Sequence, residues 1–252
     1  MNARELLFRS PRFDLAFKYL YALNRERPER EFALYREMYL ESIRIFNGFR
    51  EISPPKSSPL DFLTSFDALI EQIRRDGFDQ RFAIPLDRMM NPLDGAHRIA
   101  IAAALDIEVP VCVKMDTIKA LDDDYRHFYK RKLKGNVSLL DQAALEFSEA
   151  NPFMRAVCIS RKCPVGIYRR VHEALIRQGN IYLKRCGVNE EFWLFVPSLQ
   201  DFALPNVGSG VSVRGTHRET MDAASEFFSA VPKKETFCNR FRRKYMNPYM
   251  GV

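Results

Sequence analysis

The chain has no stretch approaching the roughly 20 consecutive apolar residues needed to span a bilayer. Its first residues, 1–11, include Arg4 and Arg9 and only one short apolar run, which is not the pattern of a secretory signal. These absences argue against membrane insertion and predict a cytoplasmic protein. The sequence also lacks the G-x-x-x-x-G-K-[ST] pattern and the protein-kinase motifs, which argues against a P-loop or a protein-kinase fold.

The cysteines form no recognisable metal or redox pattern. There are five, an odd number, without a C-x-x-C pair and without zinc-ligand spacing. Cys112 and Cys158 lie in apolar runs, so we expect them to be reduced core residues.

Length and composition are those of a folded protein with an anionic partner. The 252 residues suit one large domain or two small ones, and 46% are hydrophobic. The net charge of +7 favours a nucleotide, a phosphosugar or a nucleic acid as partner. Two basic runs, 126–134 and 240–244, contain aromatic residues and resemble nucleic-acid surfaces. Solvated charges on a helix face and a tail explain the runs equally simply, and we favour that explanation.

The first part of the chain predicts two helices between Phe13 and Phe46, separated at Pro28. Apolar residues recur there at helical spacing: Leu15, Phe17, Leu20 and Leu23, then Phe32, Tyr35, Tyr39, Ile43 and Phe46. We interpret this segment as an N-terminal helical layer.

The middle of the chain predicts the order helix, strand, loop, helix, strand. Ser58 as N-cap, Pro59 at the first helical position and Asp61 in the first turn start a helix, and Gly77 ends it. Its expected apolar stripe is Leu60, Leu63, Phe66, Leu69, Ile70 and Ile73. The next elements are expected at 82–86 (strand), 97–105 (helix) and 107–113 (strand). Later elements are expected at 154–159 and 181–183 (strands) and at 164–178 and 216–230 (helices).

The pentapeptide Asp94-Gly95-Ala96-His97-Arg98 opens the second of these helices directly after an extended segment. The first amides of a helix lack internal partners, and the helix dipole is positive there. Gly95 lets a ligand approach the backbone, Arg98 suits phosphate oxygens, and His97 can donate or accept a hydrogen bond near neutral pH. The pattern predicts a phosphate-binding site. An N-capping Asp94, a turn glycine and a surface His-Arg pair are the alternative.

The context of this motif resembles a known superfamily. The segment Ile84-Pro85-Leu86, the motif, an alanine-rich helix and the strand Ile107–Val111 together resemble the ParB/sulfiredoxin superfamily. The Asp-Gly-x-His-Arg form resembles its free serine kinase branch. The resemblance implies an α/β fold with a ParB/sulfiredoxin-like nucleotide-binding domain at 49–115. Helices at 1–48 would precede it, and a C-terminal α/β region at 116–252 would follow.

The kinase branch implies roles for individual residues. Glu51 corresponds to its general base, whereas Asp94 and His97 would serve phosphate and metal during catalysis, Asp94 as the Mg²⁺ ligand. The nucleotide, ATP or ADP, would lie on Gly95, Ala96, His97 and Arg98. Arg50 and Lys56 are candidates for substrate binding, although both could be ordinary surface charges. The implied reaction is phosphoryl transfer to a hydroxyl of a sugar or an amino acid.

Departures from the superfamily limit the alternatives. Sulfiredoxins carry a reactive cysteine where this chain has Ala96, which argues against reduction of sulfinic acids. No helix-turn-helix is evident after Met115, as DNA-partitioning relatives would need. A ParB-like nucleic-acid-binding protein or nuclease remains the competing hypothesis, and a non-catalytic scaffold is a third.

A second segment, Gly215-Thr216-His217-Arg218, repeats part of the motif. It could be another anion site, but Thr216 as N-cap with Glu219 three residues later forms a capping box, which we favour. The segment is also loosely similar to one in proteins of bacterial surface-polysaccharide clusters, with Arg214 in place of a histidine. That likeness favours a sugar as substrate. Nearby, we expect Trp193 in the core rather than in a base-stacking platform.

Overall fold

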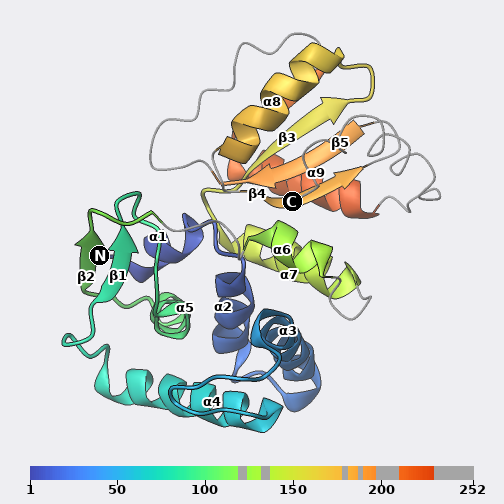
Figure 1. Ribbon diagram of the computed structural model, residues 1–252. Coiled ribbons are helices and arrows are strands. Elements are labelled where there is room, and N and C mark those ends of the chain that lie inside the picture. The colour runs from blue at the N-terminus through green and yellow to red at the C-terminus, as the bar shows by residue number, and fades with distance from the viewer. Residues whose placement is uncertain (119–123, 132–136, 178–180, 187–189, 197–209, 230–252) are drawn as a thin grey trace.

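The computed structural model describes residues 1–118, 124–131, 137–177, 181–186, 190–196 and 210–229. The protein is mixed α/β, as the sequence predicts. Helices and a two-stranded parallel sheet make up the N-terminal part, and a four-stranded antiparallel sheet with flanking helices follows (Figure 1). Among the described residues, no helix has the length and apolar character to cross a membrane.

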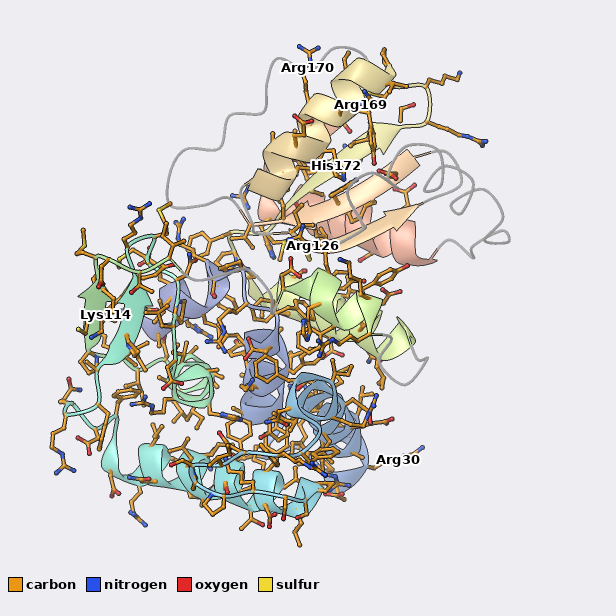
Figure 2. The ribbon with its side chains drawn as sticks, in the orientation of Figure 1. Arg30, Lys114, Arg126, Arg169, Arg170 and His172 are labelled. Atoms are coloured by element: carbon orange, nitrogen blue, oxygen red, sulfur yellow. The ribbon has the colours of Figure 1, made fainter. Side chains whose placement is uncertain are left out.

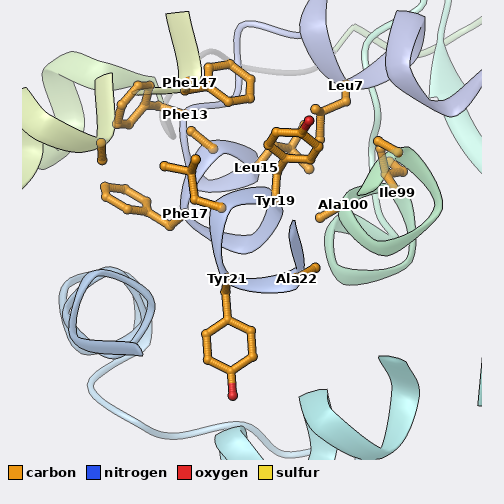
Figure 3. Close-up of a cluster of buried hydrophobic side chains, with 14 of the residues drawn as sticks. Leu7, Phe13, Leu15, Phe17, Tyr19, Tyr21, Ala22, Ile99, Ala100 and Phe147 are labelled. Carbon is orange, nitrogen blue, oxygen red and sulfur yellow. The ribbon is translucent and has the colours of Figure 1, made fainter. Parts of the chain in front are cut away.

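Three N-terminal helices surround the main hydrophobic core: α1 (Ala3–Phe8), α2 (Asp14–Asn24) and α3 (Glu29–Asn47). The two expected helices are confirmed, with Pro28 as the N-cap of α3. Helix α2 is central and is buried on most sides, and it packs against α3, α5 (Ala96–Ala104) and α7 (Val137–Ala150) (Figure 3). Leu23 and Phe46 were expected in the apolar stripes, but they are 46% and 49% exposed because each faces away from this core.

Helix α4 (Pro59–Asp76) begins and ends as the sequence predicts. The Ser58 hydroxyl accepts from the Asp61 amide at 3.2 Å, and Asp61 in turn accepts from the Ser58 amide at 2.9 Å. The Gly77 amide donates to the Ile73 carbonyl at 2.9 Å. The expected stripe is wrong at one position: Leu60 is exposed, and Phe62 occupies the buried face instead.

The expected order of strand, helix and strand is confirmed in β1 (Ile84–Asp87), α5 (Ala96–Ala104) and β2 (Val111–Lys114). The two strands pair in parallel, with Ile84 opposite Val111, and α5 is the crossover between them. Helix α5 packs its Ile and Ala side chains against α1 and α2. The final strand is shorter than expected, and Cys112 is exposed rather than buried.

The C-terminal region contains α6 (Tyr125–Lys130), α7 (Val137–Ala150), β3 (Arg155–Ser160), α8 (Val165–Arg177), β4 (Ile181–Cys186), β5 (Glu190–Phe195), β6 (Val211–Arg214) and α9 (His217–Ser229). The sequence did not predict α6, α7, β5 or β6. The strands pair antiparallel in the order β4-β5-β3-β6.

Alternate residues of the central strands serve two cores. In β3, Ala156 and Cys158 join the main core, whereas Val157 and Ile159 join a smaller core with α8. Strand β5 alternates in the same way between the two cores, and its Trp193 packs in the smaller core, as expected.

Candidate functional site

The start of α5 is built around Gly95. This residue is the N-cap of the helix and has φ +79°, in the left-handed region that favours glycine. A Cβ atom at Gly95 would lie 2.7 Å from Cδ1 of Ile84 in β1 and 3.3 Å from Nη2 of Arg98. Two features therefore require glycine at this position: the backbone conformation and the close approach of Ile84 and Arg98.

Substitution of Gly95 by Ala is expected to lower the free energy of unfolding by roughly 2–4 kcal/mol, combining backbone strain with overpacking against Ile84. Urea unfolding measures the loss. Gly48 is the matched control, because it has φ +64° but nothing within 4 Å of its Cβ position. Gly48→Ala should cost only about 1–2 kcal/mol. Equal losses in the two variants would contradict the steric part of the argument.

The first turn of α5 presents amide groups and a guanidinium together. The N-cap supplies no side-chain hydrogen bond to these amides. The exposed Asp94 accepts from the Gly95 amide at 2.6 Å through Oδ1. Arg98 donates from Nη1 to the Phe82 carbonyl at 3.0 Å, which holds its guanidinium beside Gly95. A helix terminus with this arrangement suits an anion.

His97, in the same turn, lies against two aromatic rings. Its ring centroid is 4.7 Å from that of Phe66 in α4, and a hydrogen bond of 3.0 Å joins its Nε2 to the Tyr39 hydroxyl of α3. Burial, followed by the positive charges of Lys18 and Lys56, holds the pKa of His97 well below 6.5. The imidazole is therefore neutral near neutral pH, where one ring nitrogen can donate a hydrogen bond and the other can accept one.

A buried charge cluster, which the sequence analysis did not identify, adjoins this turn. Asp14 accepts from Arg12 at 3.0 and 2.8 Å and from Lys18 Nζ at 2.7 Å, and each side chain is less than a tenth exposed. Arg12 also donates to the carbonyl of Pro92, in the loop that leads to α5, at 3.4 Å. We name these three residues the Arg12–Asp14–Lys18 cluster.

The signal for this cluster was present in the sequence. Asp14 and Lys18 are four residues apart, and therefore on one face of a helix whose other residues are mostly apolar. Charged residues in such a helix are either exposed or paired, and burial of α2 on most sides selects pairing.

Glu51 and Lys56 form a turn beside the Tyr39–His97 pair. Their backbones exchange two hydrogen bonds of 3.0 Å, and Lys56 Nζ lies 2.5 Å from Glu51 Oε2. The charge of Lys56 lowers the His97 pKa, as described above. The Tyr39 pKa is raised, first by burial and then by neighbours that include Tyr21 and Glu51. Glu51 thus acts electrostatically on Tyr39, the hydrogen-bond partner of His97, and its function as a catalytic base stays a prediction.

The remaining predicted site residues have simple surroundings. Arg50 is exposed, and its side chain makes no hydrogen bond or ion pair with the described residues. Ala96 is the first residue of α5 and contributes only its backbone. Among the described residues, no group of three or more His, Cys, Asp or Glu side chains is placed to hold a metal ion. Asp94, the carboxylate that the sequence analysis assigned to Mg²⁺, therefore does not belong to such a group.

The second motif proves to be a helix cap, as favoured above. The Thr216 hydroxyl accepts from the Glu219 amide at 3.2 Å, and Glu219 accepts from the Thr216 amide at 3.0 Å. A hydrogen bond of 2.9 Å joins His217 Nε2 to the Ser148 carbonyl at the end of α7. The residues that could have met an anion therefore stabilise α9 and its contact with α7.

Comparisons with known proteins add no assignment: no family model matches the chain, and neither the curated proteins nor the solved structures contain a significant match.

Proposed function

We propose that the protein is a nucleotide-dependent small-molecule kinase with a ParB/sulfiredoxin-like domain. It would transfer a phosphoryl group from ATP or ADP to a hydroxyl of a sugar or an amino acid. The observation that carries the proposal is the start of α5, where first-turn amides that receive no side-chain cap from the described residues lie together with the Arg98 guanidinium. The Arg12–Asp14–Lys18 cluster contacts the loop that leads to this turn through the Pro92 carbonyl.

The local topology supports the same proposal. A helix, a strand, a glycine-containing loop, a helix and a parallel strand follow one another in the order that the resemblance implies. In α/β units, ligands bind where loops leave the carboxyl ends of the strands. The Asp94–Arg98 motif is at such a position, after β1.

Each residue then has a chemical function. The nucleotide phosphates accept hydrogen bonds from the α5 amides, Arg98 and the neutral His97. Asp94 fits a Mg²⁺ ion held by one carboxylate, phosphate oxygens and water, a common arrangement for this ion. Mg²⁺ would supply charge neutralisation. The substrate hydroxyl gives its proton to Glu51 as its oxygen bonds to the terminal phosphorus, and the bond from phosphorus to the leaving oxygen breaks. Lys56 binds Oε2 of Glu51, and Oε1 would accept the proton of the hydroxyl.

A thermal-shift screen of the full chain tests nucleotide binding. ATP and ADP with Mg²⁺ should each be compared with Mg²⁺ alone and with inorganic phosphate. A nucleotide at 100 times its Kd stabilises the folded state by about 2.7 kcal/mol. Stabilisation by a nucleotide beyond that by phosphate supports the proposal. A melting temperature that no nucleotide changes would contradict the proposal.

Replacement of Arg98 by Ala is expected to weaken nucleotide binding by more than about tenfold, because a charge-assisted contact worth roughly 1.5–3 kcal/mol is lost. Calorimetric titration measures the change. Arg75→Ala is the control, because Arg75 is an exposed arginine at the far end of α4 that pairs with Asp76. Affinity that is unchanged in Arg98→Ala, or equally reduced in both variants, contradicts the assignment.

Nucleic-acid binding is the second candidate function, favoured by a different surface. Four exposed cations lie at the start of α8 and in the turn before it: Arg161, Lys162, Arg169 and Arg170 (Figure 2). The first basic run offers less, because Arg126 pairs with Asp124 and Arg131 donates to the Ile45 carbonyl at 3.1 Å. The second basic run, 240–244, lies outside the described residues. A steep negative dependence of DNA affinity on salt concentration would indicate several phosphate contacts and favour this candidate.

A further inference from the structure

The hydrogen bond between Tyr39 and His97 has a direction that burial determines. Tyr39 is fully buried, and its hydroxyl makes no other hydrogen bond with the described residues. A buried phenol needs an acceptor for its proton, because an unsatisfied donor costs about 1–3 kcal/mol. Among the described residues, His97 Nε2 is the one hydrogen-bond partner of this hydroxyl, so the Tyr39 hydroxyl donates and Nε2 carries no proton.

The tautomer of His97 follows from this direction. A neutral imidazole has one N–H, and with Nε2 as acceptor the proton must be on Nδ1. The side chain of His97 is only partly buried, and Nδ1 makes no hydrogen bond with the described residues. The Nδ1–H group is therefore available to a ligand at the first turn of α5.

Two rings hold the imidazole in this orientation. The His97 ring meets that of Phe66 edge to face, at 73°, and that of Tyr39 at 80°. Tyr21 packs on both aromatic partners, with ring centroids 5.0 Å from each. Rotation of the imidazole would break this packing as well as the hydrogen bond.

Charged groups around the pair keep the ring neutral. Asp14 and Lys18 act on it from α2, Arg12 from two residues before that helix, and Lys56 from the 51–56 turn. Three of these four are cations, which oppose a further positive charge on the imidazole. Helix α4 contributes the apolar Phe66, whereas the charge of its Asp67 acts on Tyr39.

We propose that Tyr39 is a positioning residue of the phosphate site, whose hydroxyl fixes His97 as an uncharged Nδ1–H donor to a phosphoryl oxygen. The proposal rests on the proposed function for the identity of the ligand, but the tautomer itself does not depend on it. A neutral donor leaves Arg98 as the charged partner of the phosphate in this turn. The affinity of the site for its anion then does not depend on a histidine that titrates near neutral pH.

The tautomer can be read directly by ¹⁵N NMR of the full chain labelled at histidine. The chain has four histidines, and His97→Gln assigns the signal of interest. We expect His97 to show a protonated Nδ1 and an unprotonated Nε2, unchanged between about pH 8 and 6 because its pKa lies well below that of free histidine. Tyr39→Phe keeps the ring and removes the donor, so the Nε2–H form should appear.

Tyr21→Phe is the matched control, because it removes a hydroxyl from the neighbouring buried ring. That hydroxyl donates to Asp67 at 2.8 Å and does not contact His97. The control should leave the His97 tautomer unchanged. An Nε2–H form in the wild type, or equal changes in the two Tyr→Phe variants, would overturn the proposal.

Nucleotide titration of the same variants provides the functional measurement. Tyr39→Phe should weaken binding about fivefold, the equivalent of one hydrogen bond of about 1 kcal/mol, whereas Tyr21→Phe should not. Unchanged affinity in Tyr39→Phe alongside a changed tautomer would reject Tyr39 as a positioning residue. If the wild type binds no nucleotide, the proposed function fails while the NMR result still decides the tautomer.

Discussion

Replacing Glu51 with Gln is expected to lower the turnover number for phosphoryl transfer by about 10² to 10⁴, because a general base contributes on that scale. The amide keeps the size of the side chain but cannot accept the hydroxyl proton. Nucleotide affinity should stay nearly unchanged, because the proposed mechanism has the phosphates bind at α5 rather than at Glu51. Steady-state kinetics and calorimetric titration of one preparation measure the two quantities.

Glu37→Gln is the control for this change. Glu37 is an exposed glutamate on α3, and its replacement should leave turnover unchanged. A Glu51→Gln enzyme with the wild-type rate would remove the base from the mechanism. Loss of nucleotide affinity without loss of turnover would instead place Glu51, with its partner Lys56, in the binding surface.

Replacing Asp14 with Asn is expected to lower the free energy of unfolding by about 3–5 kcal/mol, because it removes the buried carboxylate that binds both Arg12 and Lys18. Urea unfolding of the variant and the wild type measures the change. Glu31→Gln is the control: Glu31 pairs with Arg27 on the surface, where both side chains are more than half exposed. The control should cost less than about 1 kcal/mol.

The same cluster predicts a dependence of stability on pH. Burial raises the pKa of Asp14, but the charges of Lys18 and Arg12 outweigh it and hold the pKa far below the ordinary value of 3.8. Because the pKa of Asp14 is lower in the folded than in the unfolded chain, its ionised carboxylate stabilises the folded state at pH values above the unfolded pKa. This stabilisation is lost as the pH falls below about 4. The loss should be smaller in Asp14→Asn. Equal acid sensitivity in the two proteins would show that another carboxylate dominates.

The start and end of α4 were predictable because their causes are local. Ser58, Asp61 and Gly77 satisfy helix-terminal groups within four residues along the chain, so no knowledge of the rest of the fold is needed. The start of α5 was predictable for the same reason, since Gly95 and the following residues define it together. The capping box of α9 is a third local feature that the sequence indicated.

Periodicity identified amphipathic helices but did not decide which side of each is buried at its ends. Leu60 was expected in the core of α4 and is exposed, whereas Phe62 is buried, because the neighbours of the first turn select the buried face. The strands β5 and β6 were missed because short strands gain their stability from partners far along the chain. In the sheet, β3 pairs with both of them.

The amino-acid sequence alone specified the helix start at Asp94–Arg98, the helix caps and the alternation of helix and strand around Gly95, because each depends on neighbours a few residues away. Only the folded chain decided the charge state and tautomer of His97. These depend on Tyr39, which is 58 residues away, and on the burial of Arg12, Asp14 and Lys18 beside the loop at Pro92. Burial and long-range hydrogen bonds set the pKa of a side chain, and neither is encoded in local sequence spacing.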